Sequence, residues 1–150
     1  MDAQQVRVAD LVGAITANVY MLLIIAVFAA RILGLLEIGQ WIGLASTLAL
    51  IPLAYLFVVG LHTNRRRIYF VWLSLMISLL LFELIVDHMV RLDFRSATWT
   101  AVPYVMFSFG ATGGMIGVAA QAGRTWAIVT TLIFIIMAAM AFIQRAETGL

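Results

Sequence analysis

Ionisable side chains gather at the end of one long apolar stretch, residues 68–90. Glu83, Asp87 and Arg91 are spaced four residues apart, so on a helix they share one face, with His88 close beside them. Carboxylate, imidazole and guanidinium groups can hold a proton, a cation or a polar ligand. Within a membrane such groups usually face the protein interior. We therefore take these four residues as candidate binding residues.

The depth of Glu83 in the membrane determines how costly its charge is. Counted from Ile68, it lies about 22 Å along a helix, inside a hydrocarbon core roughly 30 Å thick. Arg31, about 30 Å along the first helix, reaches the level of Asp87. Two interpretations stay open. Glu83 pairs with Arg31 for structural reasons, or it binds a proton, an ion or a ligand, with Arg31 as a neighbour. An ordinary ion pair would also account for Asp87 and Arg91.

Several other chemistries lack the residues they need. Cysteine is absent, which removes disulfides, thiolate metal sites and thiol nucleophiles. His62 and His88 fall near opposite ends of neighbouring segments, so we expect no haem bound by both. Only one segment offers ligands for a metal, and no catalytic triad, phosphate loop or zinc-protease motif occurs. We expect no cofactor and no metal, and the sequence identifies no catalytic residue.

The elements that position these residues are membrane-spanning helices. Hydrophobic residues make up 65% of the chain and charged residues 11%, so the bilayer is the expected solvent. Each span needs roughly 20 apolar residues, and short polar breaks make neighbouring spans antiparallel. We predict an all-α polytopic membrane protein, a single domain over residues 1–150. Its bundle of about five helices lies near residues 11–30, 41–61, 68–90, 99–121 and 126–143.

The fourth predicted span is the least regular because it is rich in glycine. Gly110 and Gly114, like Gly113 and Gly117, have the spacing that lets membrane helices approach closely. We expect close packing there, within the bundle or between subunits. Leucine at Gly114 or Gly117 should disrupt it, whereas Gly123 in the following loop should tolerate leucine. The alternative is a broken or re-entrant segment, which leaves four spans.

Four other positions inside the predicted spans are polar or irregular. Asn18 must find a hydrogen-bond partner, most simply on a neighbouring helix. Pro52 removes a backbone hydrogen bond from the second span and should kink it. Ser108 and Thr112 could offer hydroxyl groups to a ligand, or donate them to carbonyl groups of their own helix.

Arginines give the expected orientation. Arg65, Arg66 and Arg67 form the densest basic group, so we expect the loop that carries them, and with it the N-terminus, to face the cytoplasm. The C-terminus then lies outside, and we expect a bacterial inner membrane. The basic residues are too few and too scattered for nucleic-acid binding.

Three classes of function fit these observations. The first is a small transporter or channel subunit with Glu83 as its proton or cation site. Five short helices enclose little volume, so we expect it to form a homo-oligomer. The second is a structural or accessory subunit of a membrane complex, or a lipid-binding protein, with membrane lipid or another membrane subunit as partner. The third, an intramembrane enzyme acting on a lipid, has the least support, because enzyme sites join polar groups from several helices.

Overall fold

The computed structural model describes residues 3–86 and 98–148, and these form helices joined by short turns. Five helical segments are long and apolar enough to cross a membrane, which confirms the predicted helical bundle. Many large apolar side chains on their outer faces are exposed, as expected for contact with lipid. The elements are α1 (Ala3–Ile32), α2 (Leu36–Ser46), η1 (Thr47–Ala49), α3 (Leu50–His62), α4 (Arg67–Glu83), α5 (Thr98–Ala119), η3 (Ala120–Ala122) and α6 (Arg124–Thr148).

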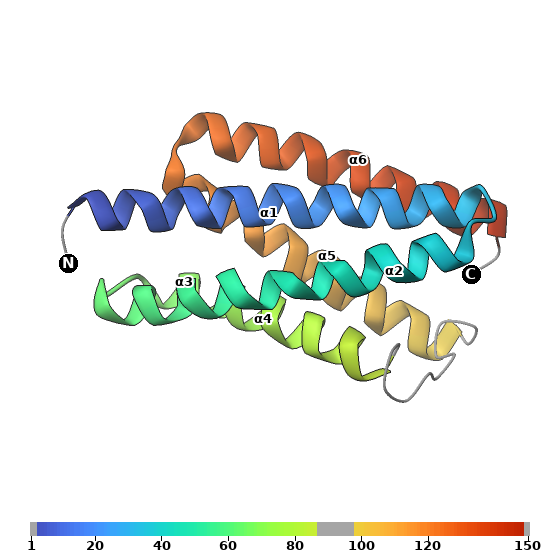
Figure 1. Ribbon diagram of the computed structural model, residues 1–150, viewed down its shortest axis with the longest axis horizontal. Helices are drawn as coiled ribbons and strands as arrows, with labels where there is room; N and C mark the ends of the chain where they lie inside the picture. Colours follow the sequence, from blue (N-terminus) through green and yellow to red (C-terminus); the bar gives the residue numbers. More distant parts are fainter. Residues whose placement is uncertain (1–2, 87–97, 149–150) are drawn as a thin grey trace.

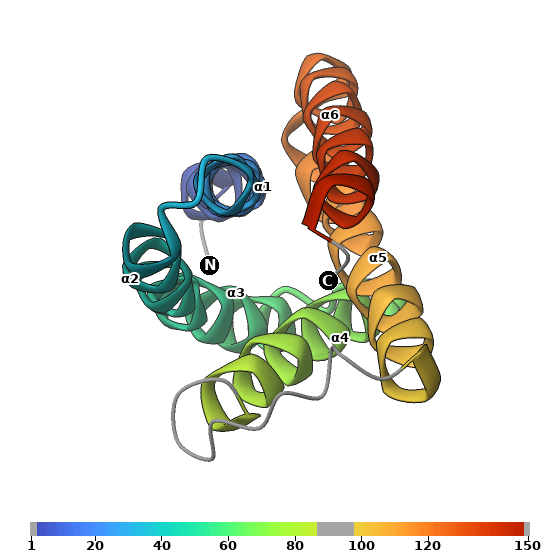
Figure 2. The same ribbon diagram turned by 90° about the vertical axis from the view of Figure 1, so that its right-hand side faces the viewer.

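Helix α1 is the element around which the others are organised. It lies between α2 and α6 and also contacts α3 and α5, while α4 packs between α3 and α5 (Figure 2). Along the bundle, the start of α1, the α3–α4 turn and the α5–α6 turn lie at one end, which we call the Arg65 end (Figure 1). The α1–α2 turn and the last residues of α4 and α6 lie at the other, the Glu83 end.

Residues with positive φ make the turns between the helices. Gly34 has a φ of 73° after α1, and the next amide, that of Leu35, donates to the Ala30 carbonyl at 2.8 Å, which closes the helix end. Asn64 has a φ of 50° between α3 and α4. Gly123 has a φ of 133° between η3 and α6, a backbone conformation that L side chains rarely adopt. The expectation that Gly123 tolerates leucine is therefore wrong.

Proline acts differently in the second and fourth spans. The second span changes to a 3₁₀ turn at η1 and then resumes as α3, so the missing N–H of Pro52 falls in the first turn of a helix, where proline is tolerated. The irregularity expected at Pro52 thus takes the form of the 3₁₀ turn just before it. Helix α5 contains Pro103 near its start and continues to Ala119. The alternative of a broken or re-entrant fourth segment is therefore wrong.

Two glycines of α5, Gly114 and Gly117, pack against one aromatic side chain rather than against another backbone. The indole of Trp72 on α4 lies over Gly114 and Gly117, and a Cβ built on Gly114 would come within 2.8 Å of the Trp72 Cδ1. A Cβ on Gly117 would overlap the far edge of the same ring. Gly113 makes only ordinary contact with Phe134, and nothing described lies within 4 Å of a Cβ built on Gly110. Among these four glycines, close packing is thus confined to Gly114 and Gly117.

Candidate functional site

A cavity of about 170 Å³ lies inside the bundle toward the Glu83 end. Its walls combine apolar side chains with polar ones that come from α1, α2, α4, α5 and α6. The polar side chains in the wall are those of Tyr20, Arg31, Ser46, Glu83, Tyr104, Ser108, Thr112, Gln144 and Arg145. The cavity therefore brings together polar groups that the sequence separates by more than a hundred residues.

Helical periodicity explains how α5 and α1 supply their share of the wall. Tyr104, Ser108 and Thr112 are spaced four residues apart and so lie on one face of α5. On α1 the lining runs from the buried Tyr20 to Arg31 in the last turn. Because a cation at the C-terminal end of a helix is favoured by the helix dipole, Arg31 is well placed there even without a ligand.

Glu83 is held by a tyrosine that the sequence did not single out. The Tyr104 hydroxyl donates a hydrogen bond to Oε1 of Glu83 at 2.5 Å. The Tyr104 ring also contacts the ring of Phe82, and the two ring centroids are 6.1 Å apart. The buried Tyr20 lies within electrostatic range of both Glu83 and Tyr104. A carboxylate and two phenols from three helices thus form the polar centre of the cavity wall.

Of the charged residues singled out from the sequence, two meet in the cavity. Arg31 and Glu83 line the same wall, together with the exposed Arg145 in the last turn of α6. Direct pairing of Arg31 with Glu83 stays a prediction. Asp87, His88 and Arg91 lie outside the described residues.

The hydroxyls of Ser108 and Thr112 have different surroundings. Thr112 Oγ1 donates to the Ser108 carbonyl at 2.6 Å, so its bond stays within α5. The Ser108 Oγ is buried and has no hydrogen-bond partner within the part of the chain that the structure describes. Because a buried hydroxyl without a partner is costly, Ser108 is the wall residue best suited to meet a polar atom of a water or ligand.

Asn18 lies on α1, away from the wall of the cavity. Its Nδ2 donates to the Ala14 carbonyl of its own helix at 2.9 Å. Its Oδ1 is buried and has no partner among the described residues. The expected bond from Asn18 to a neighbouring helix is therefore wrong.

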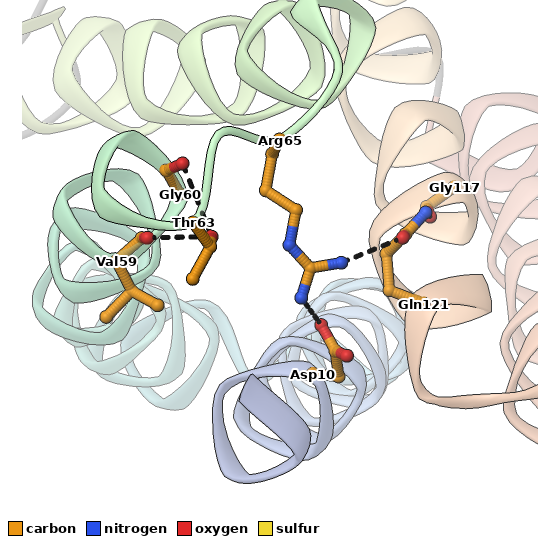
Figure 3. A network of polar contacts seen from close by, with 7 residues as sticks. All are labelled: Asp10, Val59, Gly60, Thr63, Arg65, Gly117 and Gln121. Atoms are coloured by element: carbon orange, nitrogen blue, oxygen red, sulfur yellow. Dashed lines mark hydrogen bonds and ion pairs between the residues drawn. The ribbon is translucent and has the colours of Figure 1, made fainter. Parts of the chain in front are cut away.

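A second polar group joins three elements at the Arg65 end (Figure 3). Nη2 of Arg65 forms an ion pair with Oδ1 of Asp10 at 2.5 Å, and Nη1 donates to Oε1 of Gln121 at 3.0 Å. The guanidinium also lies 5.6 Å from the centre of the Tyr69 ring. One side chain in the α3–α4 turn thereby connects α1, α4 and η3.

Sequence reasoning interpreted Arg65 only as an orientation signal and overlooked this group. Asp10 precedes the predicted first span and Gln121 ends the fourth, so both flank apolar segments at the end expected to carry Arg65. That shared position was the available signal, but which of three neighbouring arginines would turn inward depends on the turn geometry. The structure selects Arg65, since Arg66 and Arg67 are exposed.

Fold and site together define a polytopic membrane protein whose helical bundle contains a cavity lined by apolar side chains and several polar ones. Comparison of the chain with protein-family models, curated proteins and solved structures finds no match. The function must therefore be inferred from the geometry of the cavity and of the Arg65 end.

Proposed function

We propose that the protein is a small membrane transporter that binds a proton or a small polar ligand in the cavity around Glu83. The observation that carries this proposal is the Tyr104–Glu83 hydrogen bond in a wall to which five helices contribute polar groups. A carboxylate at membrane depth is costly, and such residues commonly belong to proton or substrate pathways. We further propose that the protein works as a homo-oligomer or beside another membrane subunit, because its five helices enclose little volume.

The chemistry of the Tyr104–Glu83 pair suits a site that gains and loses a proton. A phenol donates to an ionised carboxylate, and its oxygen can accept from a protonated one, so the pair can persist in both states of Glu83. The cavity is also large enough to hold the water molecules that would carry a proton to and from Glu83. An apolar cavity of roughly 150 Å³ holds a benzene molecule, and the polar groups in the largely apolar wall of this cavity offer water hydrogen bonds that a wholly apolar cavity lacks. A volume of about 170 Å³ therefore accommodates several waters or one small ligand.

A lipid-modifying enzyme is the second candidate. From the sequence, this candidate has the least support, because only one segment offers several polar groups. The cavity, however, brings together polar groups from several helices. Glu83 could act as a general base there, and the unpartnered Ser108 hydroxyl lies in the same wall. Transport is preferred because no bond joins Ser108 to a base among the described contacts, as activation of a serine requires.

The proposed location is a bacterial inner membrane, with the Arg65 end in the cytoplasm. Support comes from Arg66 and Arg67, which are exposed at that end and are the kind of residue retained on the cytoplasmic side. The cavity would then lie nearer the opposite face of the membrane.

The test of the transport proposal is a charge-displacement measurement on purified protein in liposomes, adsorbed to a supported membrane electrode. A rapid drop in pH should give a transient current in the wild type, because a proton enters the field of the membrane to reach Glu83. Glu83→Gln should abolish the current. Glu37→Gln removes an exposed carboxylate on α2 and should leave it unchanged. Equal currents from the wild type and Glu83→Gln would overturn the proposal.

A further inference from the structure

The Asp10–Arg65–Gln121 group lies well away from the cavity. On α1 the cavity lining begins at Tyr20, which is about 15 Å along the helix from Asp10. On α5 the lining ends at Thr112, roughly 13 Å short of Gln121 by the same helical rise. A layer of protein therefore separates the cavity from the Arg65 end.

This layer is closely packed. Ala14 and Ala17 on α1 are fully buried, and a Cβ built on Gly13 would come within 2.9 Å of Cγ1 of Val118 on α5. The indole of Trp72 fills the space over the glycines of the same part of α5. Small residues on α1 thus let α5 approach closely, and the contacts between these helices fill the layer between the cavity and the Arg65 end.

The ion pair between Arg65 and Asp10 lies on the side of this layer that faces the Arg65 end. The side chains of Arg65 and Asp10 are only 17% and 13% exposed, so both charges have given up most of their contact with water. Such a pair contributes little net stability, because desolvation offsets the attraction between the charges. When the helices at this end of the bundle separate, water hydrates both charges again, so the pair opens at a small cost in free energy.

We infer that Asp10, Arg65 and Gln121 form a gate that shuts the path between the cavity and the Arg65 end. This inference rests on the proposed transport function. A transporter must expose its site to one side of the membrane at a time, and the cavity lies near one end while the gate holds the other end together. Opening requires the α3–α4 turn, which carries Arg65, to move away from α1 and η3.

The absence of cysteine makes the gate directly testable. Ser108→Cys introduces one thiol into the cavity wall at nearly constant size. Asp10→Asn or Arg65→Gln is then added to the Ser108→Cys protein. Each protein is placed in oriented vesicles and treated with a membrane-impermeant maleimide from the Arg65 side. We expect labelling at least about fivefold faster than with the intact gate, because removing one partner of a mostly buried pair costs at least as much as breaking an exposed one. Arg66→Gln removes a neighbouring exposed arginine and should leave the rate unchanged.

Two further variants separate the opening of the gate from a general loss of folding. Gln121→Ala removes only the hydrogen bond to Arg65 and should give a smaller increase in labelling. The exchange Asp10→Arg with Arg65→Asp restores a pair of opposite charges and should return labelling to the slow rate. Unchanged labelling in Asp10→Asn, Arg65→Gln and Gln121→Ala, with a lowered melting temperature, would overturn the gate and leave a purely structural ion pair.

The labelling assay and the current measurement fail separately. Faster labelling in the gate variants without any Glu83-dependent current would sustain the gate and reject the proposed transport function. A Glu83-dependent current with unchanged labelling would reject the gate alone.

Discussion

The hydrogen bond from Tyr104 to Glu83 makes a specific prediction about stability. Hydrogen bonds to charged groups contribute about 1.5–3 kcal/mol, so Tyr104→Phe should lower the free energy of unfolding by an amount in this range. Glu83→Gln weakens the same bond, so the double variant should lose less than the sum of the two single losses. Unfolding in mixed detergent micelles measures all three.

Tyr55→Phe provides the matched control, because Tyr55 is 45% exposed on the outer face of α3. Its loss of a hydroxyl should change stability little. Strictly additive losses for Tyr104→Phe and Glu83→Gln would contradict a direct bond between the two residues.

The Ser108 hydroxyl leads to a prediction of the opposite sign. Since its Oγ is buried without a described partner, Ser108→Ala should leave the free energy of unfolding unchanged or raise it, by up to the roughly 1–3 kcal/mol that an unsatisfied buried group costs. The pH-induced current should fall if that hydroxyl meets water or ligand in the cavity. A clear loss of stability would show that Ser108 has a structural partner and would remove it from the binding wall.

Residues of the cavity differ in how far the sequence could reveal them. Glu83 is conspicuous because a carboxylate interrupts an apolar run, and the structure places it in the cavity wall. Tyr104 and Gln144 were not identified, since tyrosine and glutamine near the ends of spans have many ordinary roles. Only the crossing of α5 and α6 beside α4 and α1 shows that they face the same cavity. The way in which these helices cross is a property of the tertiary structure, and residue type and spacing do not reveal it.

Helices α4 and α5 fit together through Trp72, which leads to a test by small substitutions. Gly117→Ala places a Cβ in overlap with the edge of the Trp72 indole and should cost about 1–3 kcal/mol, the usual range for overpacking. Gly110→Ala meets no described atom within 4 Å and should gain up to about 1 kcal/mol from improved helix propensity. Thermal unfolding in one detergent compares the two.

Replacement of the indole tests the cause of this difference. Trp72→Leu should recover much of the stability lost in Gly117→Ala, because the smaller side chain leaves room for the new methyl group. If Gly110→Ala and Gly117→Ala proved equally harmful, packing against Trp72 would not explain the glycine pattern.

The spans themselves were predictable because hydrocarbon thickness fixes their length. Their ends were less so. Helix α1 begins at Ala3 rather than near Leu11, since the polar residues before the apolar run continue the same backbone hydrogen bonding. The 3₁₀ turn at η1 was expected only as a kink, because proline signals an irregularity without fixing its form.

At the scale of the whole molecule, the two ends of the bundle differ in chemistry. The Glu83 end contains a cavity whose apolar wall includes several polar groups, whereas the Arg65 end is closely packed and joined by an ion pair. Helices α1 and α6 both run toward the Glu83 end, as an odd number of spans requires when the termini lie on opposite faces (Figure 1). Orientation in the membrane therefore decides from which compartment the cavity is reached.

The final prediction is that the Arg65 end faces the cytoplasm. Arg65 is partly neutralised by Asp10, but Arg66 and Arg67 stay exposed and should hold the α3–α4 turn inside. A reporter that is active only in the cytoplasm should be silent when fused after Leu150 and active when inserted after Asn64. The reversed pattern would mean that the cavity opens toward the cytoplasm. Activity at both sites would mean an even number of spans between them and would contradict the three helices, α4, α5 and α6, that follow Asn64.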